Sequence, residues 1–186
     1  MIVSFTGAQS TGKTTLLNAI KLDRRFRKFS FIDEVTRLVK KKYNLSINEE
    51  GNDLTQLAIL STHLDNYLTF RGKDVVLDRC ILDGLVYTAY LNNIGKVKDE
   101  VAEYAELLTN TLINKVDIIF YTEPDIPLVD DGERSIDVEF RNKIIDLFEE
   151  AIDHYKLNVV RLRGSVDNRL ELIYNIIDNY GKSNIR

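Results

Sequence analysis

The stretch Gly7-Ala-Gln-Ser-Thr-Gly-Lys-Thr14 matches the full pattern G-x-x-x-x-G-K-[ST], and this match decides the fold class. The apolar run Ile2 to Phe5 comes before it, and the helical run Thr15 to Ile20 comes after it. A strand, a glycine-rich loop and a helix are therefore predicted in that order. In such a loop the glycines permit a tight turn, so that successive backbone N–H groups and the helix N-terminus form a cradle for phosphate.

Two side chains of this loop have separate expected roles. Lys13 would bridge the β- and γ-phosphates of a bound nucleotide, and the Thr14 hydroxyl would ligate Mg2+. We expect Lys13 to contact only phosphates, at a solvent-facing loop. The predicted cofactors are ATP and Mg2+. The residues expected to bind ATP are Gly7, Ala8, Gln9, Ser10, Thr11, Gly12, Lys13, Thr14 and Thr15.

Short apolar bursts alternate with longer segments of helical spacing, and this alternation indicates an α/β fold. The bursts are Ile2 to Phe5, Phe29 to Ile32, Val75 to Leu77, Ile118 to Tyr121 and Val159 to Leu162. Two of the helical segments run from Leu54 to Leu68 and from Ile144 to Tyr155. Because crossover helices join parallel strands, we predict a three-layer P-loop NTPase fold with a five-stranded, mainly parallel sheet and the cradle at its central strand.

The composition restricts the organisation of the chain and its setting. A chain of 186 residues with 44% hydrophobic residues can bury one sizeable core, so a single domain over residues 1–186 is expected. Cys80 is the only cysteine, so no internal disulfide is possible and a reduced, cytoplasmic setting is favoured. The apolar run at residues 1–5 is shorter than a signal peptide needs and no stretch of 18 apolar residues occurs, so neither a signal peptide nor membrane association is expected.

Charge argues against one class of partner. The net charge of −4 opposes general attraction to nucleic acid, since such binding needs a basic surface. Basic runs over residues 21–28 and 40–42 are usually solvated faces, although they keep a nucleic-acid acceptor open. A small-molecule nucleoside or nucleotide is the favoured partner, and the oligomeric state is left undetermined.

A phosphate cradle occurs both in hydrolases and in kinases, and the acidic residue at the end of the third strand helps to distinguish these two classes. The strand Val75 to Leu77 runs into Asp78 and Arg79, and Asp78 is placed to hold Mg2+ as a Walker B aspartate does. Hydrolases of the AAA type usually have Glu where this chain has Arg79. Because a guanidinium can clamp acceptor oxygens or the transferring phosphoryl group, transfer to a bound acceptor is favoured over hydrolysis. The alternative is an Asp-Arg pair that only caps the next helix.

Candidate acceptor-side residues follow the second strand. Asp33 and Glu34 end the burst Phe29 to Ile32, with Arg37 about one turn later. Ligands of open parallel sheets sit at the carboxyl ends of the strands, so one of the two carboxylates could accept the proton of an attacking hydroxyl while Arg37 binds the acceptor. Asp83 is a second candidate for binding the acceptor. The alternative is an exposed ion pair on an acidic helix start.

The segment Glu123 to Ser135 is predicted to be a loop, because it holds both prolines and the turn Asp130-Asp131-Gly132. Arg134 lies just after this turn. We expect a mobile lid that brings Arg134 over the phosphates, excludes water and neutralises developing charge. A solvated hairpin with scattered charges is the alternative.

Other polar motifs have simpler interpretations. Asn114-Lys-Val-Asp117 spells the N-K-x-D of GTPases, but it precedes a strand instead of following one, so it is interpreted as chance. Cys80 is expected to be a small buried residue at a helix start. His63 and His154 lack metal-ligand spacing and are expected to be structural or exposed.

The chain resembles the ribosylnicotinamide kinase domain of bacterial NadR proteins over nearly its full length. Gly7 to Thr15 looks like the cradle of that family, and Glu34-Val-Thr-Arg37 is similar to its Glu-x-x-Arg. Val129-Asp-Asp-Gly-Glu-Arg134-Ser135 looks like its lid motif and is the most specific of the three. The resemblance implies a nucleoside or nucleotide kinase-like fold and ATP-dependent phosphorylation. It covers no adenylyltransferase domain, so only the kinase step is expected.

Two features depart from the NadR pattern. Asp78-Arg79 looks like the Asp-Arg of deoxynucleoside and thymidylate kinases, and Asp33 occupies the place of the catalytic acid in deoxynucleoside kinases. The leading prediction is therefore a kinase for a nucleoside-type hydroxyl, either nicotinamide riboside-like or a (deoxy)nucleoside. A nucleoside monophosphate kinase, a kinase of a modified pyrimidine in phage-type DNA, and a regulatory P-loop NTPase are the alternatives.

Overall fold

The computed structural model describes residues 1–126 and 137–183, and it describes side chains up to residue 180. The strands are β1 (Ile2–Thr6), β2 (Ser30–Ile32), β3 (Val75–Asp78), β4 (Ile118–Thr122) and β5 (Val160–Leu162). The α-helices are α1 (Lys13–Lys21), α2 (Val35–Tyr43), α3 (Asp53–Phe70), α4 (Ile81–Asn93), α5 (Asp99–Leu112), α6 (Val138–His154) and α7 (Val166–Ser183). Short 3-10 helices are η1 (Arg24–Phe26), η2 (Asn48–Glu50) and η3 (Ile113–Lys115).

The five strands form one sheet in the order β2-β3-β1-β4-β5, and every pairing is parallel. The predicted fold class is confirmed, with the cradle following the central strand β1. Strand bounds differ from the predicted bursts by one residue. Phe29 and Val159 fall outside β2 and β5 because their N–H groups close turns onto Phe26 and Leu157.

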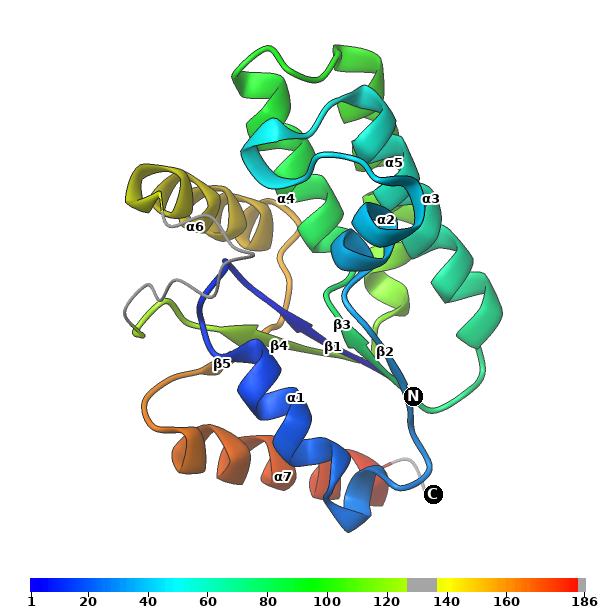
Figure 1. Ribbon diagram of the computed structural model, residues 1–186. Coiled ribbons are helices and arrows are strands. Elements are labelled where there is room, and N and C mark those ends of the chain that lie inside the picture. The colour runs from blue at the N-terminus through cyan, green and yellow to red at the C-terminus, as the bar shows by residue number, and fades with distance from the viewer. Residues whose placement is uncertain (127–136, 184–186) are drawn as a thin grey trace.

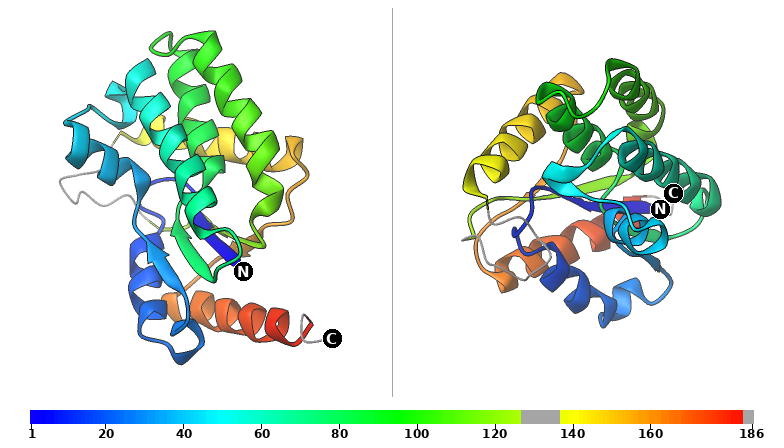
Figure 2. Two further views of the ribbon diagram at one scale, coloured as in Figure 1. Left: turned by 90° about the vertical axis from the view of Figure 1, so that its right-hand side faces the viewer. Right: turned by 45° about the horizontal axis from the view of Figure 1, so that its top comes forward.

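Helices cover both faces of the sheet, which makes three layers (Figure 1). One face packs on α1 and α7, and the other packs on the group α3 to α6 (Figures 1 and 2). Alternate residues of β4 confirm this division, since Phe120 joins the core with α1 and α7 while Tyr121 joins the core with α4 to α6. Burial on both faces explains why the strands appear in the sequence as continuous apolar runs.

The layers place the carboxyl ends of the strands at one edge of the sheet. In the parallel register Phe5 of β1 pairs with Asp78 of β3, and Thr6 pairs with Tyr121 of β4. The loop between β1 and α1 therefore lies beside Asp78 and the end of β4. Parallel pairing brings residues far apart in the sequence to this edge, where the candidate site lies.

Candidate active site

The cradle owes its shape to three residues with left-handed backbone angles. Gly7, Ser10 and Gly12 have φ values of 129°, 56° and 84°. A Cβ atom on Gly7 would lie 2.8 Å from both the carbonyl and the hydroxyl oxygen of Thr122, so only glycine fits between β1 and β4. Gly12 makes the left-handed turn directly before α1 begins at Lys13. The sequence pattern thus forms the predicted strand, loop and helix.

Side chains from distant helices hold the cradle from outside. Arg169 of α7 is 1% exposed, donates to the Thr11 carbonyl at 2.7 Å and forms an ion pair with Asp125. Arg141 of α6 donates to the Gln9 carbonyl at 3.3 Å. Sequence reasoning missed both arginines. They lie more than a hundred residues from the loop, and no local motif marks them.

Lys13 lies differently from the sequence expectation. It is 6% exposed, and its Nζ donates to the carbonyls of Gly7 at 2.7 Å and Ala8 at 2.6 Å and to the Thr11 hydroxyl at 3.2 Å. The expectation that Lys13 contacts only phosphates was therefore wrong. Burial and the nearby positive charge of Arg79 lower the pKa of Lys13. An anionic phosphate beside Nζ would favour its charged form.

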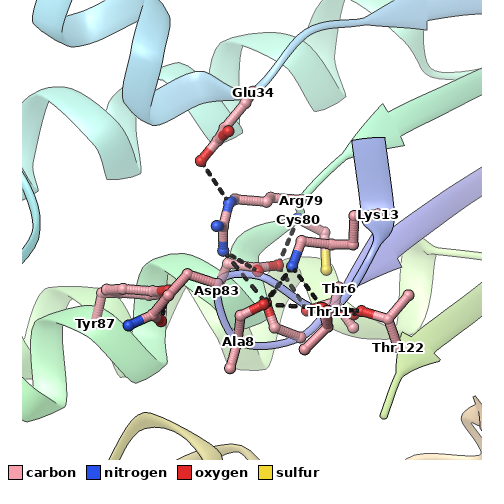
Figure 3. Close-up of polar contacts among 12 residues, drawn as sticks. Thr6, Ala8, Thr11, Lys13, Glu34, Arg79, Cys80, Asp83, Tyr87 and Thr122 are labelled. Carbon is pink, nitrogen blue, oxygen red and sulfur yellow. Dashed lines mark hydrogen bonds and ion pairs between the residues drawn. The ribbon is translucent and has the colours of Figure 1, made fainter. Parts of the chain in front are cut away.

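Arg79 lies at the centre of a buried network that joins three elements (Figure 3). It is 8% exposed and has a left-handed φ of 74°. Its Nε donates to Glu34 Oε1 at 2.8 Å, and its Nη1 donates to Asp83 Oδ1 at 3.0 Å. A longer contact of 3.4 Å joins Nη1 to the Gly7 carbonyl. The guanidinium thus ties the start of α2 and the first turn of α4 to the cradle.

Asp83 is buried inside this network. It is 2% exposed, and its Oδ2 accepts hydrogen bonds from Thr6 Oγ1 at 2.7 Å and from the Cys80 N–H at 3.0 Å. The Cys80 bond closes the first turn of α4, whose N-cap is Cys80 and not the Asp78-Arg79 pair. Asp83 therefore has the contacts of a residue that orients Arg79. The sequence suggested Asp83 as a residue that binds the acceptor, but both of its carboxylate oxygens accept hydrogen bonds from other groups of the protein.

A cavity of about 320 Å³ lies between α1 and α2 at the strand ends. It brings together five of the predicted site residues, namely Thr14, Asp33, Glu34, Arg37 and Asp78. A hydroxyl and a carboxylate are hard oxygen ligands of the kind that Mg2+ prefers, so Thr14 and Asp78 suit the ion that the motif implies. Burial and the negative charge of Glu34 raise the pKa of Asp78. A bound cation would favour the ionised carboxylate.

The two candidate bases differ in their surroundings. Glu34 accepts a hydrogen bond from Arg79 Nε at Oε1, at 2.8 Å, and one from Arg37 Nε at Oε2, at 2.9 Å. Burial alone would raise the pKa of Glu34, but the charges of Arg79, Lys13 and Arg37 outweigh it and lower that pKa from 4.5 to about 2. The stabilising effect of ionised Glu34 is thus present above pH 4.5 and is lost as the pH falls through about 2. Asp33 is 77% exposed and lies 3.7 Å from Lys21.

Replacing Arg79 tests how far this network holds the fold together. We expect Arg79→Met to lower the free energy of unfolding by about 3–5 kcal/mol, because two buried carboxylates lose their cation. Arg37→Met is the matched control, since Arg37 is 43% exposed and its pair with Glu34 should contribute less than about 1 kcal/mol. Urea unfolding of the nucleotide-free protein near neutral pH measures both. Equal effects of the two substitutions would contradict the network.

A contact missed by the sequence analysis joins the cradle to α4. The Tyr87 hydroxyl donates to Gln9 Oε1 at 3.2 Å, and the Tyr87 ring lies 5.3 Å from the Arg79 guanidinium. Tyr87 also lines a small cavity with Arg79, Asp83, His63 and Gln56. Burial and the charge of Arg79 lower the pKa of His63 to about 3, so this histidine is neutral at physiological pH.

The remaining motifs lie as the simpler interpretations expect. Asp117 accepts from the Ile2 N–H at 2.6 Å and from the Tyr180 hydroxyl at 2.9 Å, at the amino end of β4 and so at the opposite edge from the cradle. Burial raises the pKa of Cys80 to about 12, so this thiol is a buried core residue. His154 is exposed. The lid candidate Arg134 lies outside the described residues, which include the loop only from Glu123 to Ile126.

A parallel sheet with a phosphate cradle after its central strand and an aspartate at the end of the adjacent strand defines a P-loop nucleotide-binding fold. A family model described as an AAA domain matches residues 2–169, and the chain belongs to this family. No curated protein sequence matches the chain. Among residues 1–126 and 137–183, no helix has the length and apolar character needed to cross a membrane.

Several solved structures share this fold at low sequence identity. The NadR protein in complex with NR is 22% identical with a TM-score of 0.72, over 97% of this chain and 50% of the NadR chain. The chain thus spans about half the length of that protein. Deoxyadenosine kinase from M. mycoides is 14% identical with a TM-score of 0.67, over 97% of this chain and all of the kinase. Thymidylate kinase from Candida albicans is 17% identical with a TM-score of 0.60, over 97% and 92% of the two chains.

Proposed function

We propose that residues 1–186 form a single kinase domain that transfers the γ-phosphoryl group of ATP to a nucleoside-type hydroxyl. One observation carries this proposal: Thr14 and Asp78 share a cavity of about 320 Å³ with the acidic residues Asp33 and Glu34. That volume is within the range of small-molecule sites. An acceptor hydroxyl in this cavity would lie beside both the metal-binding candidates and a candidate base. The names of the similar solved structures, which include deoxyadenosine and thymidylate kinases, support the same class.

The cradle residues would manage the donor. Backbone N–H groups of the Gly7–Thr14 loop and the α1 N-terminus would hold the β- and γ-phosphates, and Lys13 would exchange its bonds to loop carbonyls for phosphate oxygens. Thr14 and Asp78 would hold Mg2+, which supplies charge neutralisation at the phosphates when bound. Fixing the phosphates in this way orients the γ-phosphorus toward the cavity.

The reaction needs one proton acceptor and an excess of positive charge. The acceptor hydroxyl oxygen would form a bond to the γ-phosphorus, the bond from that phosphorus to the bridging oxygen would break, and ADP would leave. Asp33 or Glu34 would take the hydroxyl proton. Arg79 would stabilise charge from its place beside Gly7, with Asp83 and Glu34 fixing its orientation.

Arg134 is proposed to complete the site from the lid. Arg134→Ala should lower kcat by roughly 10²-fold or more while changing the KM for ATP much less, because a contact made only in the transition state leaves ground-state binding intact. Arg134→Lys should recover little, since a point charge does not replace the planar guanidinium. Steady-state kinetics of both variants measure this. An unchanged kcat in both would remove Arg134 from the active site.

A regulatory NTPase is the competing function, because the cradle alone is common to switches and motors. The sequence position directly after Asp78 favours transfer, since it holds Arg79 where AAA-type hydrolases usually have the glutamate that polarises water. The deciding experiment incubates the protein with γ-labelled ATP and a panel of nucleosides, nucleotides and modified DNA. Label on one member of the panel supports the kinase, whereas label on phosphate alone, at a rate that no acceptor changes, supports the NTPase.

A further inference from the structure

The cavity between α1 and α2 carries three cations at the end away from the cradle, here called its outer end, to which the transfer step above gives no role. Lys21 of α1 and Arg37 and Lys41 of α2 line the same cavity as Thr14. Lys21 follows Thr14 by seven residues on one face of α1, which corresponds to about 10 Å along the helix. Groups that hold the transferring phosphoryl lie within hydrogen-bond distance of it, about 3 Å. Lys21 is therefore placed about two helical turns from the cradle, farther along the cavity than Thr14.

Two of these cations, Lys21 and Lys41, are weakly compensated by the acidic residues of the described part of the chain. The Lys21–Asp33 contact is 3.7 Å long, and the two side chains are 41% and 77% exposed, so the pair is weak. Glu34 pairs with both Arg37 and the buried Arg79, and Arg79 also pairs with Asp83. Lys41 forms no ion pair within residues 1–126 and 137–183. The outer end thus keeps positive charge in a chain whose net charge is −4.

Apolar side chains lie between the cations. Phe31 of β2 lines the cavity and lies 5.5 Å below Lys21 Nζ, and Leu38 of α2 lines it with 42% of its surface exposed. An aromatic ring next to cations suits a flat base with an attached anion, since stacking and ion pairing act on different parts of such a ligand. The cavity thus combines Asp78 next to the cradle with apolar side chains and with the cations Lys21, Arg37 and Lys41.

We propose that the acceptor carries a phosphate group of its own, which Lys21, Arg37 and Lys41 bind at the outer end of this cavity. This inference rests on the proposed kinase function and narrows its substrate class to nucleotides over free nucleosides. The phosphate belongs either to a mononucleotide or to the backbone of a nucleic acid. Both sources offer the same anion to the same three cations.

The test measures binding, so its result does not depend on turnover. With the cradle saturated by MgADP, calorimetry compares the four deoxynucleosides, their 5′-monophosphates and a mixed-sequence hexadeoxynucleotide. We expect at least one phosphate-bearing probe to bind about 10-fold or more tightly than its nucleoside, with an advantage that shrinks as salt rises. Equal affinity for monophosphate and hexanucleotide indicates a mononucleotide acceptor, whereas higher affinity for the hexanucleotide indicates nucleic acid.

Matched variants locate the site. Lys41→Ala should remove most of the phosphate advantage, whereas Lys40→Ala, an exposed lysine on the same helix outside the cavity, should leave it unchanged. Both should bind MgADP like the wild type. Absence of any phosphate advantage, or equal losses in the two variants, would overturn the inference. Label transfer to a free nucleoside in the same preparation would still support the proposed kinase, so the two failures are distinguishable.

Discussion

Lys13→Ala is expected to slow phosphoryl transfer by about 10²- to 10³-fold. Its ammonium is the cation that the P-loop motif supplies to the β- and γ-phosphates, and one preorganised donor of this kind contributes roughly 10²- to 10³-fold. The variant loses both the charge and the three hydrogen bonds that fix Nζ inside the loop. Transfer from γ-labelled ATP at saturating donor and acceptor measures the effect.

The burial of Lys13 makes a fold control necessary for this variant. Its Nζ bonds to the Gly7 and Ala8 carbonyls, so the substitution also removes contacts that shape the cradle. Lys28→Ala, an exposed lysine away from the cradle, serves as the control for general effects. Thermal unfolding should show a folded Lys13→Ala protein whose stabilisation by MgADP is reduced. Turnover close to that of the wild type would remove the cradle from the mechanism.

The second large effect is expected at the carboxylates that end β2. One of Asp33→Asn and Glu34→Gln should reduce kcat by roughly 10²- to 10⁴-fold with ATP affinity preserved, as expected for loss of a general base. The structure also separates the two variants by stability. Glu34→Gln should lower the free energy of unfolding because Arg79 loses a buried charge partner, whereas Asp33 is 77% exposed and its amide should be neutral.

Kinetics and unfolding of the two amides together identify the base. If one amide variant loses rate at unchanged stability, the residue that it replaces is the proton acceptor. If Glu34→Gln alone loses both rate and stability, Glu34 is either the base or the residue that orients Arg79. Normal rates in both would leave proton removal to Asp78 or to no base, because a loose transition state needs little base assistance.

The sequence predicted the fold well because its signals are local. A cradle motif between a strand and a helix fixes the central strand, and apolar bursts mark strands that are buried on both faces. The positions of Thr14, Asp33, Glu34, Arg37 and Asp78 around one cavity follow from the same reasoning, since parallel strands end at one edge.

Contacts between distant segments could not be predicted in this way. Arg169 bonds the Thr11 carbonyl across 158 residues of sequence, and no motif marks an arginine in a late helix as part of a cradle. The bond from Lys13 Nζ to the Gly7 carbonyl and the bond from Arg79 to the Asp83 carboxylate also depend on which groups lie nearby in three dimensions. A motif specifies residue types at a site, whereas the remaining hydrogen-bond partners come from tertiary packing.

The destination of the γ-phosphoryl group tests the central proposal most directly. The protein is incubated with MgATP labelled at the γ-position, with and without each acceptor of the panel, and both ADP and labelled products are quantified. The kinase account predicts ADP formation that depends on one acceptor, with one labelled acceptor molecule for each ADP formed. ADP formation at the same rate without any acceptor, with all label recovered as inorganic phosphate, would contradict it.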